Sequence, residues 1–143
     1  MTAQTPVGLI QTAIYTLLDA DVDESGAGTL GALGVEGVFD HVPEGTPKPY
    51  VVVGEAYETP RNSHSEHGRR TVHTIHVWSD HRGYSEATGI CDVIIALLDH
   101  QPMTLAGFNT VSVRFEFLQL APDPDPDVRH ALVRFVVTTE QTS

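Results

Sequence analysis

Two stretches of the chain place apolar residues at the spacing of an amphipathic helix. The first begins at Thr5-Pro6, where a capping hydroxyl precedes a proline at the first helical position, and we expect it to end near Ala20. The second begins after Gly83 with Ser85 as its cap and ends near His100. The expected buried stripes are Val7, Ile10, Ala13, Ile14, Leu17 and Leu18 in the first helix and Ala87, Ile90, Cys91, Ile94, Leu97 and Leu98 in the second.

Four longer stretches and one short one have the alternation or the β-branched and aromatic content of strands. They are Val38 to Asp40, Tyr50 to Glu58, Thr71 to Ser79, Thr110 to Leu120 and Arg129 to Thr139. Alternation in the last two places one set of residues on a single face of each strand: Val111, Val113, Phe115 and Phe117, then Ala131, Val133, Phe135 and Val137.

The connections between these elements are polar, glycine-rich or proline-rich. Asp21 to Gly37 reads as a long connection, and its G-x-G-x-x-G pattern follows no strand, so it does not indicate a phosphate loop. The segment Thr59 to Arg70 forms the long, solvated tip of a hairpin, and A-P-D-P-D-P-D links the last two strands. Strands in pairs with helices between them predict one α+β domain over residues 1–143, with two helices packed on one face of a mainly antiparallel four- to five-stranded sheet.

The charge balance argues against a protein that grips nucleic acid. The chain has 8 Lys and Arg against 19 Asp and Glu, a formal charge of -11, and its one lysine is Lys48. Binding to a phosphate backbone depends on basic side chains that displace counterions. An acidic surface instead lets DNA slide past without adhering.

No apolar run approaches the ~20 residues that a membrane span needs, and the first residues lack a basic signal region. We therefore expect that the protein has no membrane partner. We also expect that it is made and folds in a cytoplasm. The single cysteine, Cys91, falls in the second helical stripe, where a buried apolar role is expected.

Five of the eight histidines lie between His64 and His81, which makes a metal site worth testing. His73 and His76 are three apart on a predicted strand, so they point to opposite faces and cannot hold one ion. His64 and His67, with Glu66 between them, lie in the flexible tip, which fixes no geometry. We expect no metal, no cofactor and no enzyme, since motifs such as G-x-S-x-G and H-E-x-x-H are absent from the sequence; a small histidine-dependent metalloenzyme remains the third alternative.

Several segments, taken in order, resemble one protein family. They are V-F-D-H-V-P-E-G-T-P-K-P-Y-V-V-V-G-E, H-V-W-S-D-H-R-G-Y-S-E-A, M-T-L-A-G-F and the closing D-P-D-x-x-x-R-H-A-L-V-R-F-V-V. From Pro6 to Glu140 the chain is similar to the tail-terminator, or tail-completion, proteins of long, flexible-tailed bacteriophages and of related prophage or gene-transfer particles.

The resemblance implies a structural protein of the virion tail, at the interface between tail and head, with no catalytic residues. In that family several copies, typically six, form a ring that caps the tail tube, ends its polymerisation and offers a surface for head attachment. The implied partners are other copies of the chain, the tail tube protein and a head-tail connector protein, and DNA passes through the bore without tight binding. The second alternative is a head-side connector or neck protein of the same particle.

If the chain forms such a ring, we expect the sheet edges and the predicted tip to make the contacts. Three of the chain's arginines gather in that tip, which is either a simple solvated loop or a basic surface that meets an acidic patch on a neighbouring copy. The candidate assembly contacts are Arg61, His64, Glu66, His67, Arg69 and Arg70.

Overall fold

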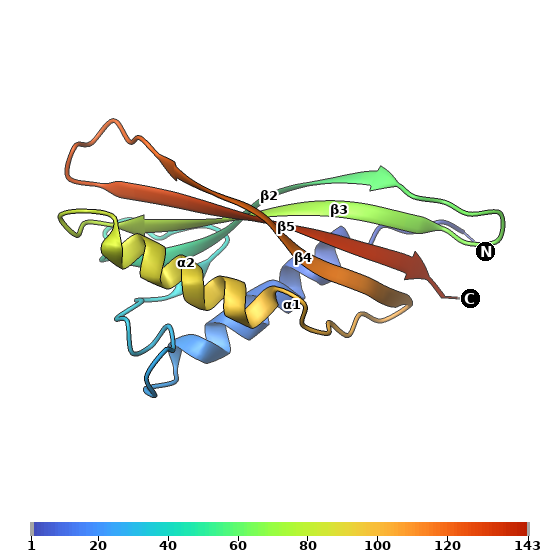
Figure 1. Cartoon of the computed structure of the whole chain (residues 1–143), viewed down its shortest axis with the longest axis horizontal. Helices are drawn as coiled ribbons and strands as arrows, with labels where there is room; N and C mark the ends of the chain where they lie inside the picture. Colours follow the sequence, from blue (N-terminus) through green and yellow to red (C-terminus); the bar gives the residue numbers. More distant parts are fainter. Residues whose placement is uncertain (1, 143) are drawn as a thin grey trace.

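A single five-stranded sheet with two helices on one side forms the structure, a computed structural model that describes residues 2–142 (Figure 1). The elements in chain order are α1 (Val7–Val22), β1 (Val38–Phe39), β2 (Tyr50–Pro60), β3 (Gly68–Ser79), α2 (Ser85–Leu98), β4 (Phe108–Ala121) and β5 (Arg129–Gln141). The strand order is β1-β2-β3-β5-β4; β1 pairs with β2 in parallel and the other neighbours are antiparallel. The predicted α+β class and mainly antiparallel sheet are confirmed.

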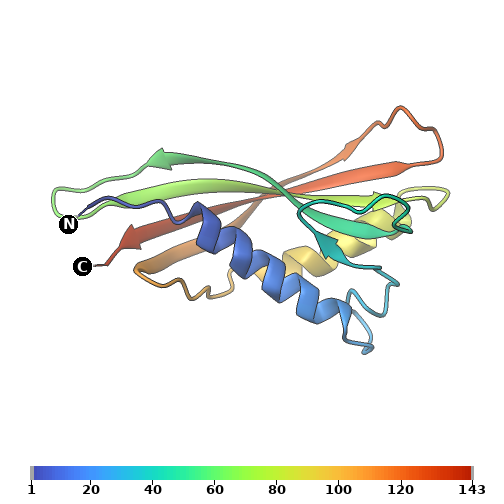
Figure 2. The ribbon, with the colours of Figure 1, turned by 180° about the vertical axis from the view of Figure 1, so that it is seen from behind.

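Both helices cover the same face of the sheet. Helix α1 packs against β1 and β2, and α2 packs against β3, β4 and β5 (Figures 1 and 2). Within residues 2–142 no helix covers the opposite face, which we call the open face. The β2–β3 hairpin extends beyond the helices, at the end where both termini lie.

The core lies between the sheet and the helices. Strand β5 lies between β3 and β4 and buries Ala131, Val133, Phe135 and Val137 completely, as the alternation predicts. The helices contribute Ile10, Ile14 and Leu18 from α1 and Ala87, Ile90, Cys91, Ile94 and Leu98 from α2. Burial also raises the pKa of the Cys91 thiol to about 12, so this cysteine behaves as a small apolar residue. The expected stripe of the first helix is too wide, because Leu17 is 39% exposed.

Strand β4 does not keep the simple alternation that its sequence predicts. Its pairing with β5 shifts between Thr110 and Ser112 and again between Phe115 and Phe117. Each extra residue of a bulge reverses the alternation beyond it. Val111 is therefore 52% exposed, and Phe117 lies on the open face, beneath the guanidinium of Arg134 at 4.6 Å. The prediction that Val111, Val113, Phe115 and Phe117 share one face is wrong for the first and last of them.

Other boundaries differ from the predictions by a few residues. Helix α1 begins at Val7, whose N–H donates to the Thr5 hydroxyl at 3.2 Å, and it continues to Val22. Strands β2 and β3 continue further into the hairpin than expected, which leaves a tip loop of residues 61–67. The glycine-rich connection folds back because the Asp21 carboxylate accepts a hydrogen bond from the Leu30 N–H at 2.8 Å.

None of the helices formed by residues 2–142 has both the length and the apolar character that crossing a membrane requires.

Replacing Phe135 with alanine will test where the core is centred. Phe135 is completely buried and packs edge-on against Phe115, so Phe135→Ala should lower the free energy of unfolding by about 3–5 kcal/mol, measured by urea denaturation. The control Leu33→Ala removes an exposed side chain and should change stability by about 0.5 kcal/mol or less. Equal effects of the two substitutions would contradict this description of the core.

Candidate functional site

The tip loop is the part of the hairpin that projects furthest from the helices. Its base closes where the Arg61 N–H donates to the Gly68 carbonyl at 2.8 Å, and the Ser63 N–H donates to the Glu66 carbonyl at 3.2 Å. A Cβ on Gly68 would lie 2.0 Å from the Arg61 carbonyl oxygen, so the closure requires glycine here. The side chains of Arg61, His64 and Glu66 are exposed around this loop.

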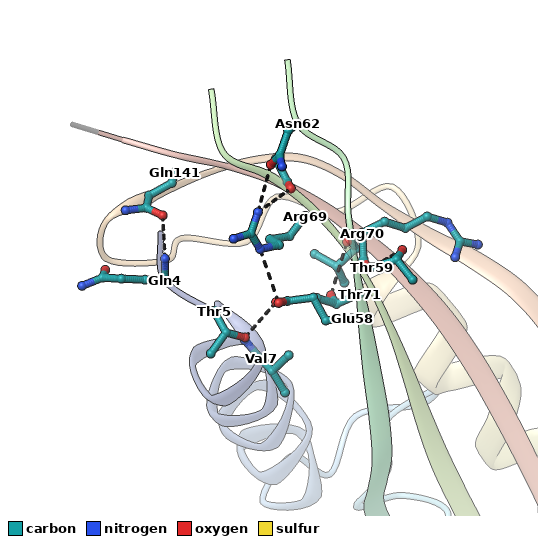
Figure 3. A network of polar contacts seen from close by, with 12 residues as sticks. Gln4, Thr5, Val7, Glu58, Thr59, Asn62, Arg69, Arg70, Thr71 and Gln141 are labelled. Carbon is teal, nitrogen blue, oxygen red and sulfur yellow. Dashed lines mark hydrogen bonds and ion pairs between the residues drawn. The ribbon is translucent and has the colours of Figure 1, made fainter. Parts of the chain in front are cut away.

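Arg69 turns back from the hairpin toward the start of α1. Its Nε lies 3.3 Å from Glu58, and its guanidinium donates to the Asn62 side-chain oxygen at 3.0 Å (Figure 3). Glu58 in turn accepts a hydrogen bond from the Thr5 hydroxyl at 2.8 Å. The Arg69 side chain is only 13% exposed. This chain of contacts connects the hairpin to the N-terminal turn of α1.

The neighbouring Arg70 points to the other side of the sheet. Figure 3 shows it directed away from the network around Arg69. Its side chain is 40% exposed on the open face and lies 3.8 Å from Glu116 of β4, an ion pair at the limit of contact distance. His67 connects the tip loop to β5 through its backbone, because its carbonyl accepts a hydrogen bond from the N–H of Gln141 at 3.0 Å.

The six sequence-predicted contacts therefore do not form one patch. Arg61, His64 and Glu66 surround the tip loop, and Arg70 lies on the open face. Arg69 is held by side-chain contacts within the chain, and His67 is joined to β5 through its backbone.

A second polar cluster lies on the open face and was not identified from the sequence. The Nδ1 atom of His76 lies 2.7 Å from Nε2 of His130, and its Nε2 lies 2.6 Å from Glu55. The His130 ring stacks on Trp78, with ring centres 3.8 Å apart and planes 7° apart. The hydrogen bond from His76 lowers the pKa of Glu55, while burial, followed by the nearby His76, lowers the pKa of His130. The cluster is a hydrogen-bonded chain across three strands, in which each ring nitrogen of His76 already has a partner.

His73 lies on the opposite, helix-covered face, as the spacing from His76 predicts. It is buried, and its Nε2 lies 3.0 Å from the Thr71 hydroxyl, while its Nδ1 has no hydrogen-bond partner among the described residues. Desolvation lowers the pKa of His73 to about 4. Among residues 2–142, no group of three His, Cys, Asp or Glu side chains is arranged to hold a metal ion. The histidines between 64 and 81 are divided among the tip loop, the core and the open face.

Separate alanine substitutions at Arg69 and Arg70 will distinguish their roles. Arg69→Ala should lower the free energy of unfolding by about 1–3 kcal/mol, because it removes a nearly buried ion pair and its hydrogen bonds. Arg70→Ala should cost about 0–1 kcal/mol, because its pair is solvated and loose. Urea denaturation measures both variants, and an equal or larger loss for Arg70→Ala would show that the two roles are assigned wrongly.

The pH dependence of stability will test the burial of His73. Because burial lowers its pKa from 6.5 to about 4, the unfolded chain takes up a proton in this range that the folded chain excludes. This contribution to stability is complete above pH 6.5 and is lost as the pH falls through 4, a change of about 3 kcal/mol. His73→Gln should remove that part of the pH dependence. The exposed control His64→Gln should keep it, and an unchanged pH profile in His73→Gln would contradict the assignment.

Comparisons with known proteins agree with one another. A family model described as "Tail completion protein gp17" matches residues 12–140. The tail completion protein gp17 of Bacillus phage SPP1 is 28% identical over 88 residues, which cover 62% of this chain and 65% of that protein, so the match spans a little under two thirds of the relative's length.

Two solved structures share the fold over nearly the whole chain. A chain of the virion of a native gene transfer agent particle has a TM-score of 0.84 at 23% identity, covering 96% of this chain and 99% of its own. The structure of bacteriophage SPP1 gp17 has a TM-score of 0.55 at 24% identity, covering 96% of each chain. At these identities the structures support the fold, and the family model covers most of the sequence. The chain therefore belongs to the tail completion protein gp17 family.

Proposed function

We propose that this chain is a structural protein of a phage-type virion tail, made and assembled in the bacterial cytoplasm. Six copies form a ring at the junction of tail and head, where the ring caps the tail tube, ends its polymerisation and provides the surface for head attachment. The observation that carries the proposal is the family model for tail completion proteins, which matches residues 12–140. The role is one of assembly, without catalysis or a cofactor.

The charge distribution supports the passage of DNA through such a ring. The formal charge of -11 gives every copy an acidic surface, and a ring multiplies that charge around its bore. Phosphates entering the bore would be repelled by its wall, so the genome would move through without tight binding.

The position of the hairpin is consistent with a role for its tip in binding the tail tube protein or the head-tail connector protein. It extends beyond the helices, so its exposed tip can reach a neighbour that the body of the subunit does not touch (Figure 1). Arg61 brings a positive charge to a molecule that is otherwise strongly acidic, and His64 and Glu66 lie beside it. Arg70 could contribute from the open face, whereas Arg69 and His67 support the hairpin from within.

A tube-assembly experiment tests the function and the tip together. Tubes of the cognate tail tube protein should stop at a defined length in the presence of the wild-type chain and become abnormally long without it, as measured in electron micrographs. The double variant Arg61→Glu/His64→Glu should keep its fold but lose about tenfold or more in capping potency, because acidic groups replace the exposed basic ones. The control Arg82→Glu reverses an exposed charge in the loop before α2, at the opposite end of the sheet, and should behave as wild type.

Particles that lack the protein separate this function from a head-side connector. Tails of normal length that fail to join heads would contradict the capping role and favour the connector. Tubes of uncontrolled length would support capping. Unchanged capping by the tip variant would place the tube contact elsewhere on the subunit.

A further inference from the structure

The outer surface of α1 is unusual for a helix exposed on an acidic protein. Residues 2–18 contain no Asp, Glu, Lys, Arg or His, although 19% of the whole chain is Asp, Glu, Lys or Arg. Large side chains are nevertheless exposed here, including Tyr15 at 40%. Charged residues are depleted at the centres of protein interfaces, and aromatic residues are enriched there. The composition of α1 thus indicates a surface that another protein covers.

A groove runs along α1 at the β1 side of the sheet. It has a volume of about 580 Å³ and is lined by Gly8, Thr12 and Tyr15 of α1 together with Phe39 and Asp40, and we call these five residues the α1 patch. Asp40 is the one carboxylate among them. The first 47 residues, which supply all five members of the patch, contain no Lys or Arg.

The opposite edge of the sheet carries a second exposed apolar surface. Val111 is 52% exposed, because the bulge turns it out of the alternation. Arg114, three residues further along β4, is also exposed, with its guanidinium 3.1 Å from Nε2 of His100. Among residues 2–142, no carboxylate lies within 4 Å of this guanidinium. We call Val111 and Arg114 the β4 patch.

The backbone along both edges is partly occupied already. On the α1 side, the Gln11 side chain donates to the Gly54 carbonyl at 3.1 Å. On the β4 side, the Val113 carbonyl accepts the His100 N–H at 2.9 Å, and the Phe115 N–H donates to Asp99 at 2.8 Å. Such contacts hinder the addition of a further strand to an edge. A neighbour at either edge would therefore bind through side chains rather than by extending the sheet.

We propose that the α1 patch of one copy docks against the β4 patch of the next copy. This inference deepens the proposed function by naming the surfaces that join subunits in the ring. A cyclic ring requires a head-to-tail interface made by two different patches on each subunit. The α1 and β4 patches lie at opposite edges of one sheet, each includes a large exposed apolar side chain, and their charges are complementary, with Arg114 in one and Asp40 in the other.

Two single variants and their mixture test this arrangement. Tyr15→Glu introduces a charge into the α1 patch and Val111→Glu introduces one into the β4 patch. We expect each variant alone to be a folded monomer by light scattering, while the wild type forms a closed oligomer. An equimolar mixture should give 1:1 dimers and nothing larger, because each variant keeps the intact patch that the other needs. Ala96→Glu, which adds the same charge to the exposed side of α2, should leave the oligomer unchanged.

Two further variants keep the test valid if one of the first two variants does not fold. Thr12→Glu and Arg114→Glu alter the same two patches at exposed positions and replace either first variant if circular dichroism shows that it is unfolded. Arg114→Glu places an acid against Asp40 of the α1 patch and should weaken association by about tenfold or more. If the α1 variants associate as the wild type does, the proposal is overturned. It is also overturned if only the α1 variants dissociate and the mixture does not pair, since the interface would then be symmetric.

Tube capping, measured with the same proteins, keeps this inference distinct from the function. If α1 variants keep the oligomer but lose binding to the tube protein, the α1 patch belongs to the tube contact and the subunit interface is wrong. If the wild type forms the oligomer through the two patches but does not limit tube length, the interface stands and the capping function fails.

Discussion

Burial of one face of the sheet beneath α1 and α2 is the interaction on which the rest of the structure depends. Strands β3 and β5 lie inside the sheet and bury Ile75, Val77, Val133 and Phe135 completely against the helices. Since full burial of one such side chain stabilises the fold by about 1.5–3 kcal/mol, this face dominates the hydrophobic contribution to stability. The arrangement also decides what remains for other proteins: the open face, two dissimilar edges and the projecting hairpin.

Polar contacts then fix the hairpin to this core. Because Arg69 is joined through Glu58 to Thr5, the hairpin and the first turn of α1 form one connected unit (Figure 3). His73 lies under the same part of the sheet and remains neutral in its buried position at ordinary pH. A protein that contacts the tip loop would therefore bind a hairpin that is connected through these polar contacts to α1.

The sequence predicts what local periodicity decides, and it does not predict what depends on pairing between distant strands. Helical spacing identifies Ile10, Ile14 and Leu18, and strand spacing places His73 and His76 on opposite faces. The bulge at Val111 depends instead on how β4 aligns with β5. The contact between His76 and His130 likewise requires the β3–β5 register, which joins residues 54 positions apart.

The orientations of the candidate assembly contacts also depend on strand pairing, which the sequence does not predict. Composition identifies the gathering of arginines in the hairpin, but the opposite orientations of Arg69 and Arg70 follow from where β3 begins and which partners lie on each side. A slight extension of both strands into the expected loop gives Arg69 an inward position and Glu58 as a partner. Composition alone therefore indicates a basic hairpin, whereas the fold separates its supporting residues from its exposed ones.

Charge places the final constraint on assembly. Copies that each carry a formal charge of -11 repel one another, so they can associate closely only where acidic groups are sparse or are met by a cation. Residues 2–18 satisfy the first condition, because they have no charged side chain, and Arg114 at the β4 edge satisfies the second. The acidic charge that would keep DNA from adhering to the bore of the proposed ring would also exclude most of the subunit surface from self-association. In the proposed ring, the same repulsion would direct contact between copies to the two edges of the sheet.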